Sequence, residues 1–357
     1  MNKDIQIGGK QIGDDQPCFI IAEMSGNHNL EYARAEEIVR AAKEAGADAI
    51  KLQTYTADTI TLNSDSPSFY TQKGGLWSGQ TLYQLYKQAY TPWEWQPKLK
   101  KLADELGIIL FSSPFDITAV DYLEKMDVPA YKIASFEIND VQLLRKVAGT
   151  GKPIIISTGI ASLEDIELAV QVCREAGNDQ IILLKCTSAY PAPYEEMNLC
   201  MIPNMKETFG YHVGLSDHSL GDEVSIAAVT LGANVIEKHF TLKRSDGGVD
   251  AAFSMEVQEM KDMVARIRHV EKAMGRVDYR LTQKQLEEKH FSRSLFVCKK
   301  IQCGERFTYE NVRSVRPGTG LHTKYLDDII GKRAARDIDF ASPLTLGDVD
   351  WGNTDHE

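Results

Sequence analysis

Short runs of almost uninterrupted apolar residues, many of them β-branched, recur along the first two thirds of the chain. Amphipathic segments separate most of them. In two of these, 30–47 and 162–178, apolar residues fall three and four positions apart and a glycine stands near the end, as in a helix. Apolar strands that alternate with helices indicate a parallel sheet, so the sequence predicts an α/β fold, a (β/α)₈ (TIM) barrel of about 250 residues. The eight runs are CFIIAE, DAIKLQT, IILFSSPF, AYKIAS, PIIISTG, IILLKCTSAY, HVGLSDHS and NVIEKHF.

Two segments fall outside this repeat. The opening IQIGGKQIG predicts a hairpin that covers the floor of the barrel. Residues 55–95 form an insertion rich in Tyr and Trp, including Phe69, Tyr70, Trp77, Tyr83 and Tyr86, between the second and third runs. An ordinary βα loop is far shorter, so this segment is either a wall of the active site or an interface.

The pattern changes again near the C-terminus. KKIQCGERFTYENV (299–312) resembles RDIDFASPLTLGDV (336–349), which aligns Ile301 with Ile338 and Phe307 with Leu344. Two half-copies of a β-rich unit predict a small C-terminal domain, with a core too small to be stable without further packing. We therefore expect a barrel domain over 1–285, a linker over 286–293 and a β-rich domain over 294–352.

Composition narrows the class of protein. The chain has 357 residues, 43% hydrophobic and 25% charged, and a net charge of −11, which is typical of a globular protein and argues against nucleic-acid binding. It has neither a signal peptide nor a run of about 18 apolar residues, so we expect a cytoplasmic protein that does not bind membranes. The six cysteines show no CxxC pair, which predicts scattered, buried, reduced thiols.

Every predicted strand ends in polar residues, at the end of the barrel where TIM-barrel enzymes carry their chemistry. The last run is the clearest case, because GANVIEKHFTL places Glu237, Lys238 and His239 in a row. Such charges are costly in an apolar core, so we expect them to face a shared cavity. Alternation along a strand means that about half of these side chains point outward instead.

Two histidines end neighbouring strands, His218 in the seventh run and His239 in the eighth. Two imidazoles without a nearby thiolate suit a divalent cation that keeps open positions for water and a substrate oxygen. The alternative is that they are ordinary hydrogen-bonded histidines. Glu237 lies two residues before His239, on the same face of the strand, where it could bind a metal-bound water or act as an acid or base.

Lys51 and Lys132 end the second and fourth strands. Two ammonium groups in one barrel mouth repel each other unless an anion or carboxylates lie between them. Serine hydroxyls surround the same rim, and this combination suits a small, multiply charged anion such as a carboxylated phosphate ester. These serines are Ser112, Ser135, Ser157 and Ser216.

The motifs that carry these residues resemble those of the sialic acid synthase family. They are FIIAEMSGNHN, AGADAIKLQTY, FSSPFD, AYKIASFEI, KPIIISTG, LKCTSAYPAP, GLSDHS, VIEKHFT and SDGGVDAAFS. The C-terminal segment with RPGTGL is similar to the antifreeze-like (SAF) domain of that family, so the resemblance covers nearly the whole chain.

Within the family, GGLWSGQTLYQLYKQAYTPWEW and SDGGVDAAFS are most similar to the pseudaminic acid synthase branch. Two departures from the commoner sialic acid pattern agree with this. Leu30 stands where glycine usually follows NHN, and Ser188 stands where asparagine is frequent. Both argue against N-acetylmannosamine as the substrate.

The resemblance implies a condensation of phosphoenolpyruvate with water and the open-chain sugar 2,4-diacetamido-2,4,6-trideoxy-L-altrose, to give pseudaminic acid and phosphate by C–O cleavage. His218 and His239 would hold Mn²⁺, with Mg²⁺ or Co²⁺ as alternatives. Lys51 and Lys132 with the four serines would hold phosphoenolpyruvate. The other residues implied are Glu23 and Asp250 for the sugar or its protons, Glu237 near the metal, and Gln53, Ser188 and Tyr190 at the substrate.

The resemblance also implies a domain-swapped homodimer. In the family the antifreeze-like domain covers the barrel of the partner subunit, and Arg316 matches the position that touches the N-acetyl group of the substrate. A plain surface charge is the alternative for Arg316.

Other functions compete with this one. By substrate, the chain could be an N-acetylneuraminate or legionaminate synthase. By mechanism, Lys132 could form a Schiff base as in an aldolase. A non-catalytic sugar-binding protein is the third alternative, but such a protein would have lost part of the acid–base and metal set that is present here.

Overall fold

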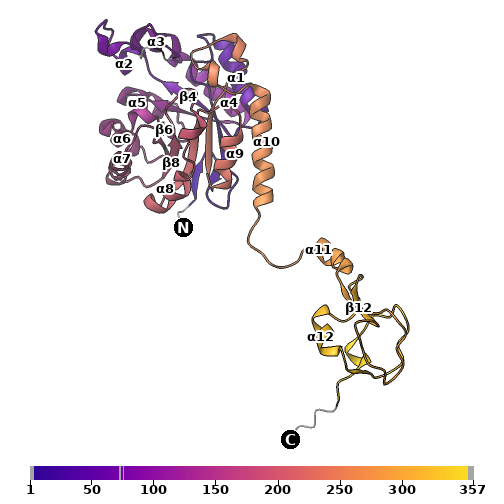
Figure 1. Cartoon of the computed structure of the whole chain (residues 1–357). Helices are drawn as coiled ribbons and strands as arrows, with labels where there is room; N and C mark the ends of the chain where they lie inside the picture. Colours follow the sequence, from indigo (N-terminus) through magenta and orange to yellow (C-terminus); the bar gives the residue numbers. More distant parts are fainter. Residues whose placement is uncertain (1–3, 72–73, 75, 353–357) are drawn as a thin grey trace. The chain divides into compact units, whose positions relative to one another are not determined.

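The computed structural model describes residues 4–71, 74 and 76–352, and it divides into two compact units, one ending at Gly275 and the other starting at Arg276. The positions of the two units relative to each other are not determined, so each is described by itself (Figure 1). The masked positions 72, 73 and 75 lie within the Trp- and Tyr-rich stretch used for the resemblance and fall outside the described residues.

The first unit is a closed barrel of eight parallel strands, which confirms the predicted fold. β10 pairs with β3 and thereby closes the ring, with Val235 opposite Phe19 and His239 opposite Glu23. All eight runs singled out in the sequence became strands. In chain order these are β3 (Phe19–Glu23), β4 (Ala49–Thr54), β5 (Ile109–Pro114), β6 (Tyr131–Ile133), β7 (Ile154–Ser157), β8 (Ile181–Cys186), β9 (His212–Asp217) and β10 (Val235–His239).

Helices alternate with these strands and surround the barrel (Figure 1). α7 shows why they form where they do. Ser162 caps its first turn by accepting from the amide of Asp165, whose carboxylate accepts in return from the amide of Ser162. Its apolar positions, among them Ile166 and Ala169, are buried. The helices are α1 (Tyr32–Glu44), α4 (Gln96–Leu106), α5 (Ile117–Lys125), α6 (Val141–Ala148), α7 (Leu163–Glu175), α8 (Met201–Phe209), α9 (Glu223–Thr230) and α10 (Val257–Met274).

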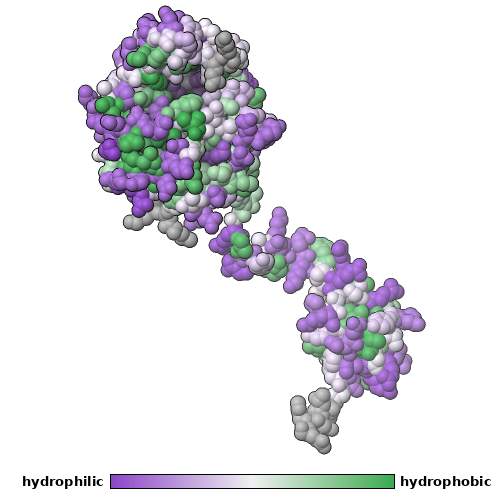
Figure 2. Space-filling model, turned by 60° about the vertical axis from the view of Figure 1, so that its left-hand side comes forward, coloured by the Kyte–Doolittle hydropathy of each residue, from purple (hydrophilic) through white to green (hydrophobic). Residues whose placement is uncertain are grey.

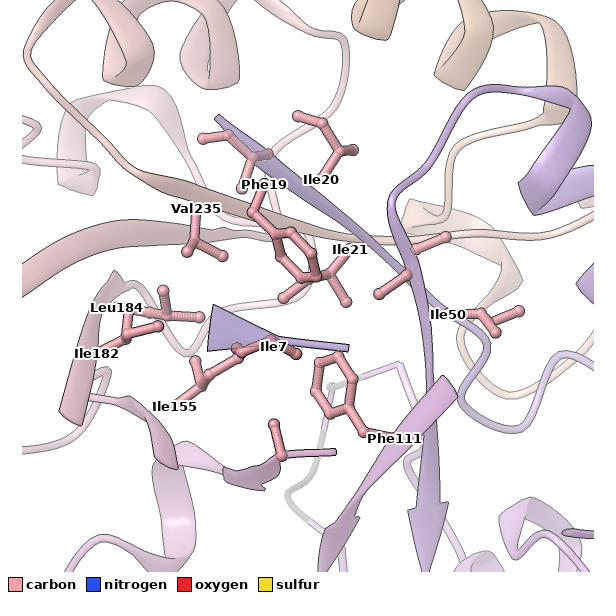
Figure 3. Close-up of a cluster of buried hydrophobic side chains, with 14 of the residues drawn as sticks. Ile7, Phe19, Ile20, Ile21, Ile50, Phe111, Ile155, Ile182, Leu184 and Val235 are labelled. Atoms are coloured by element: carbon pink, nitrogen blue, oxygen red, sulfur yellow. The ribbon is translucent and has the colours of Figure 1, made fainter. Parts of the chain in front are cut away.

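The N-terminal hairpin closes one end of the barrel, as predicted. β1 (Ile5–Ile7) and β2 (Lys10–Ile12) pair antiparallel. Ile7 is fully buried, and Figure 3 shows it among side chains of the barrel strands such as Phe19 and Ile155. Gly8 has φ +54, and a Cβ there would lie 2.7 Å from Ile109 Cγ1, so the hairpin can approach the barrel only with glycine at its turn.

The insertion after β4 contains two short helices, α2 (Ala57–Ile60) and α3 (Leu82–Ala89). Thr81 caps α3, because its hydroxyl accepts from the amide of Gln84, whose side chain in turn accepts from the amide of Thr81. Leu85 and Ala89 form the buried face of α3. The insertion is therefore a folded segment rather than an extended loop.

The second unit is a small β-rich domain with an apolar core of its own. Its two predicted half-copies meet at the centre, where Ile301 and Ile338 exchange backbone hydrogen bonds of 2.9 and 2.8 Å. Phe307 and Leu344, also aligned in the sequence, are fully buried. Its elements are α11 (Gln283–Glu288), β11 (Ser294–Val297), β12 (Val312–Val315), α12 (Leu326–Ile329), β13 (Arg333–Ala334) and β14 (Val349–Asp350).

The surface of the described residues corrects one expectation, that about the cysteines. Figure 2 shows hydrophilic and hydrophobic residues interspersed over the visible face of the barrel unit. Within the described residues, no helix is long and apolar enough to cross a membrane. All six cysteines are free, but Cys200 and Cys303 are exposed, so the expectation that the thiols are buried is wrong for these two. They lie outside the strands and helices that form the core.

Candidate active site

The carboxyl ends of the eight strands meet at one end of the barrel, and the strand register brings ionisable residues side by side there. Glu23, the last residue of β3, lies opposite Lys51 on β4 and opposite His239 on β10. All three are buried, with exposed fractions of 1%, 4% and 9%. Groups far apart in the sequence therefore share one enclosed space.

Four charges form the centre of this space. Lys51 Nζ lies 2.7 Å from Glu23 Oε2 and 3.6 Å from Glu237 Oε1. Lys132 Nζ lies 3.7 Å from the same oxygen of Glu237. The carboxylates lie beside the two ammonium groups, which is the arrangement that their mutual repulsion requires. Glu237 Oε2 is enclosed without a hydrogen-bond partner, so this cluster has an unused acceptor.

Burial and attraction act against each other on the pKa values of these groups. Burial opposes the charge of Lys51, but Glu23 and Glu237 outweigh it and raise the pKa of Lys51. For Lys132 burial prevails over Glu237 and lowers the pKa. Burial raises the pKa of Glu23 despite Lys51, whereas Lys132 and Lys51 overcome burial and lower the pKa of Glu237. Lys132 is thus the ammonium group that gains most from a further anion.

Three of the predicted serines line the same space. Lys132 Nζ donates to Ser157 Oγ at 2.7 Å, and Ser216 Oγ donates to Glu237 Oε1 at 3.2 Å. Ser135 Oγ accepts from the amide of Gly159 at 2.5 Å. A Cβ at Gly159 would collide with Ser188 Oγ, which is itself buried without a partner. The absent side chain of Gly159 leaves room beside two hydroxyls, as the approach of an anion to the backbone requires.

The fourth serine is a correction. Ser112 Oγ bonds to Thr54 Oγ1 at 2.6 Å, and Thr54 also donates to Gln96 of α4, so Ser112 faces the helices and not the cavity. Its neighbour Ser113 takes the predicted place, because Lys51 Nζ donates to Ser113 Oγ at 3.2 Å. Adjacent strand residues point to opposite faces, and the sequence stretch SS does not show which of the two points inward.

The run Glu237–Lys238–His239 is resolved in the same way. Glu237 and His239 face the cavity, but Lys238 faces the outside of the barrel and is fully buried. There it forms an ion pair of 2.8 Å with Asp217, the last residue of β9, which directly precedes His218. The expectation that all three charges face the cavity is therefore wrong for Lys238.

The two histidines lie next to each other, with ring centroids 5.4 Å apart. His218 Nδ1 lies 3.0 Å from the carbonyl oxygen of Thr187, so Nδ1 carries a proton and Nε2 is the nitrogen that could bind a metal. His239 Nδ1 is buried without a hydrogen bond, 3.8 Å from Asp250 Oδ2. Burial lowers the pKa of His239 well below its usual value, which keeps the ring in the neutral form that binds metals.

Within the described ranges no cluster of three or more His, Cys, Asp or Glu side chains is arranged to hold a metal ion. The expectation of no thiol nearby is wrong, because Cys186 Sγ lies 3.9 Å from His218 Nδ1. Two adjacent imidazoles beside a buried carboxylate still fit a divalent cation that completes its coordination with water and substrate. His218 and His239 are the residues that could hold it.

A hydrogen-bonded chain links the charged cluster to the histidines. Gln53 Nε2 donates to Glu23 Oε1 at 2.9 Å and to Ser25 Oγ at 3.2 Å, and Ser25 in turn bonds to Asp250. Burial and the neighbouring Glu23 raise the pKa of Asp250 to about 6. The predicted positions of Gln53 and Asp250 at the site therefore agree with the structure, and Ser25 is an additional member.

An aromatic wall bounds the histidines on one side. The ring of Tyr190 lies 4.5 Å from that of His218, 5.2 Å from Phe253 and 5.7 Å from Trp77. Trp77 belongs to the insertion, and its Nε1 donates to the carbonyl of Val249 at 2.7 Å. Of the two alternatives for the insertion, the structure thus supports a wall of the site.

The other aromatic residues of the insertion take different positions. Tyr86 packs edge-on against the buried ring of Tyr55 at 5.7 Å. Tyr83 bonds to Asp58 within the insertion, Tyr70 is 46% exposed and Phe69 is half-buried. Only Trp77 of the five predicted rings is in contact with Tyr190 in the described structure.

Sequence reasoning missed one carboxyl group. Glu137, just after β6, has an enclosed oxygen, Oε2, without a partner, and burial raises its pKa to about 7, with Lys132 acting against the shift. It follows Ser135 by two residues in AYKIASFEI, so it could have been found by extending the strand-end reading by one turn. Arg316 belongs to the second unit, where it is exposed next to β12.

Comparisons with known proteins show the family of the chain. The model of the NeuB family matches residues 38–279, and that of the SAF domain matches residues 292–350. The chain is 47% identical to a pseudaminic acid synthase of Campylobacter jejuni over 95% of this chain and 99% of the relative. It is 36% identical to an N,N'-diacetyllegionaminic acid synthase of Legionella pneumophila over 96% and 98% of the two chains.

Among solved structures, the N-acetylneuraminic acid synthetase of Leptospira borgpetersenii, in complex with citrate, is similar with a TM-score of 0.72 and 31% identity. The match covers 81% of this chain and 95% of that one. The family model and these relatives span both units of the present chain. The chain therefore belongs to the NeuB family of phosphoenolpyruvate-dependent nonulosonic acid synthases and carries a C-terminal SAF domain.

Proposed function

We propose that the chain condenses phosphoenolpyruvate with 2,4-diacetamido-2,4,6-trideoxy-L-altrose and water to give pseudaminic acid and phosphate. The observation that carries this proposal is the buried cluster of two ammonium groups and two carboxylates directly beside two histidines. The greater identity to a pseudaminic acid synthase, 47% against 36% for a legionaminate synthase, supports the choice of acceptor.

The anionic substrate belongs at the lysines. Lys51, Lys132 and Ser157 offer ammonium and hydroxyl donors for the carboxylate and phosphate of phosphoenolpyruvate, and Gly159 leaves space beside them. Its arrival would draw the lysines from Glu237, whose free oxygen then faces the reacting carbons. Ser135, Ser188, Ser216 and Ser113 complete the set of hydroxyls.

The reaction then needs carbon–carbon bond formation, water addition and loss of phosphate. C3 of phosphoenolpyruvate attacks the aldehyde carbon, whose oxygen takes up a proton, and positive charge develops at C2. Water adds to C2 and gives up one proton, and the C2–O bond to phosphate then breaks, while the C2 hydroxyl loses its proton to the departing phosphate and becomes the ketone. Glu23 and Glu237 lie where they stabilise the positive charge, since carboxylates favour a cation in a water-poor site.

Proton transfer falls to groups near the histidines. Asp250, with its pKa raised to about 6, can hold a proton near neutral pH and exchange it with the aldehyde oxygen. His218 and His239 would hold the divalent cation, Mn²⁺ with Mg²⁺ or Co²⁺ as alternatives. When bound, such an ion polarises the aldehyde oxygen and orients water.

The remaining parts of the proposal concern the assembly. Arg316 of the SAF domain would reach the acceptor in the barrel of a second copy, which would make the active site shared and the functional unit a domain-swapped homodimer. The substrates are intermediates of cytoplasmic metabolism, so we place the enzyme in the cytoplasm. Gel filtration that gives a monomer mass at full turnover would contradict the shared site.

Phosphate release tests the choice of substrate. The enzyme is incubated with phosphoenolpyruvate and Mn²⁺ together with the altrose sugar, its D-mannose-configured legionaminate counterpart, or N-acetylmannosamine. We expect release with the altrose sugar only. Release with another sugar instead would keep the chemistry and change the acceptor, and no release with any of them would contradict the proposed function.

A further inference from the structure

A cavity of about 530 Å³ lies between the loop after β3, the insertion and the segment before α10. Its volume falls in the range of small-molecule sites. The reaction proposed above assigns no group to it. Leu30, Leu76, Trp77, Val249 and Ala252 are the apolar side chains of its described lining.

The polar part of the lining consists of amides and hydroxyls, with Asn29, Gln80 and Gln88 among them. None of the described lining residues is charged, in contrast to the group around Lys51 and Lys132. Amide side chains pair with an acylamino group through both donor and acceptor, and the apolar residues suit its methyl group or a deoxy carbon. The cavity is therefore built for a neutral, partly apolar ligand and not for phosphoenolpyruvate.

The cavity shares its wall with the catalytic centre. Trp77 lines it, donates to the carbonyl of Val249 and contacts the ring of Tyr190, which lies 4.5 Å from His218. Val249 directly precedes Asp250. Gly26, which also lines the cavity, directly follows Ser25, the hydrogen-bond partner of Asp250, so the cavity adjoins the place at which the aldehyde of the sugar would lie.

Leu30 adds an independent observation. It has φ +56, the left-handed region in which a leucine costs about 1 kcal/mol or more relative to glycine, and its side chain is 41% exposed. Burial in the core therefore does not compensate for this strain. Strain of this kind persists where a side chain serves a ligand, and the side chain of Leu30 lines the cavity.

We infer that this cavity is the subsite for the end of the acceptor sugar remote from its aldehyde, with its second acylamino group and its deoxy carbon, and that Leu30 and Trp77 determine specificity there. This inference rests on the proposed function. It assigns the acceptor's selectivity to the insertion and the loop after β3, and it leaves phosphoenolpyruvate to the lysines.

Leu30→Gly is the sharpest test, because glycine suits φ +56 and the variant should fold at least as well as the wild type. We expect the KM for the altrose sugar to rise about tenfold, the value of one lost apolar contact, while the KM for phosphoenolpyruvate stays unchanged. N-acetylmannosamine, which has hydroxyl groups in place of the second acylamino group and the deoxy carbon, should give no phosphate release with either protein. Leu62→Ala, a 66% exposed leucine of the insertion outside the cavity, is the matched control.

Equal KM values for the altrose sugar in wild type and Leu30→Gly would overturn the subsite while the proposed function stands. Saturation-transfer NMR separates the two failures because it needs no turnover. Saturation transfer from the protein to the acetamido methyl groups of the altrose sugar can be measured even if the wild type releases no phosphate. A weaker transfer in Leu30→Gly and in Trp77→Phe would still support the subsite. Equal transfer in all three proteins contradicts it.

Discussion

Replacing Lys238 with methionine should destabilise the barrel severely, although Lys238 does not face the active site. Its Nζ lies 2.8 Å from Asp217 Oδ2 and 2.8 Å from the carbonyl oxygen of Ser219, and the side chains of both ions are fully buried. Removing one partner of a buried ion pair leaves the other charge uncompensated and costs about 3 to 5 kcal/mol of the free energy of unfolding.

The surroundings of Asp217 indicate where in this range the loss falls. Asp217 keeps three donors after the substitution, namely the amide and hydroxyl of Ser219 and the hydroxyl of Ser225, at 2.6 to 2.8 Å. These bonds stabilise the remaining carboxylate, so we expect about 3 kcal/mol. Asp217 and Lys238 are also paired in register one residue before His218 and His239, so the variant should bind Mn²⁺ more weakly.

Urea unfolding, followed by circular dichroism, measures the loss for the wild type, Lys238→Met and the double variant Lys238→Met/Asp217→Asn. Neutralising both partners removes the unpaired charge, so the double variant should recover more than half of the lost stability. Calorimetric titration measures the affinity for Mn²⁺ separately and thereby tests whether the substitution disturbs the positions of His218 and His239. A Lys238→Met protein within 1 kcal/mol of the wild type would refute the argument from the buried pair.

Three further predictions concern the active site and its proposed sharing between subunits. Ser113→Ala should raise the KM for phosphoenolpyruvate about tenfold, and Ser112→Ala should leave this KM unchanged. The reason is that Lys51 donates to Ser113 and not to Ser112. Equal effects of the two substitutions would contradict the assignment of Ser113 to the inner face of the strand. The pKa of Glu137 is raised from 4.5 to about 7 in the folded chain, so the wild type loses about 3 kcal/mol of stability between pH 4.5 and 7. Glu137→Gln should lack this loss. The variant should therefore unfold at a higher urea concentration than the wild type at pH 8, but not at pH 4. Parallel pH profiles of stability for the two proteins would contradict the raised pKa of Glu137. Mixing inactive Arg316→Ala and Lys132→Ala proteins should restore activity if each site uses the SAF domain of a partner, and a mixture that stays inactive speaks against the shared site.

The barrel could be predicted because its signals are local. Eight apolar runs became the eight strands, and amphipathic segments such as 30–47 became helices, since burial on both faces of a parallel strand demands apolar residues at every position. The half-copies of the second unit were visible for the same reason, as Ile301 and Ile338 pair at its centre.

The facing of single residues could not be predicted in the same way. The sequence does not distinguish the inward residue from the outward one in the pair Ser112 and Ser113, or in the pair Lys238 and His239. Only the register with neighbouring strands decides which residue of each pair points into the barrel. Glu137 was missed as a site residue because it lies beyond the end of β6, in a turn whose direction depends on tertiary packing.

The cluster itself depends on pairing across the closure of the barrel. Lys51 lies between Glu23 and Glu237 only because β10 returns to β3, and no spacing in the sequence encodes that proximity. The role of the insertion also depends on a contact that the sequence does not show. Its aromatic composition suggested either a wall of the active site or an interface, and the contact between Trp77 and Tyr190 supports the wall.

The most direct test of the central claim follows the bridging oxygen of phosphoenolpyruvate. The enzyme is given phosphoenolpyruvate labelled with ¹⁸O at that position, the altrose sugar and Mn²⁺, and the products are analysed by mass spectrometry. The account predicts that all of the label leaves with phosphate, because water supplies the new oxygen at C2 and the C–O bond breaks. Label retained in the sugar acid would mean that the P–O bond breaks, and it would contradict the role assigned to the buried cluster.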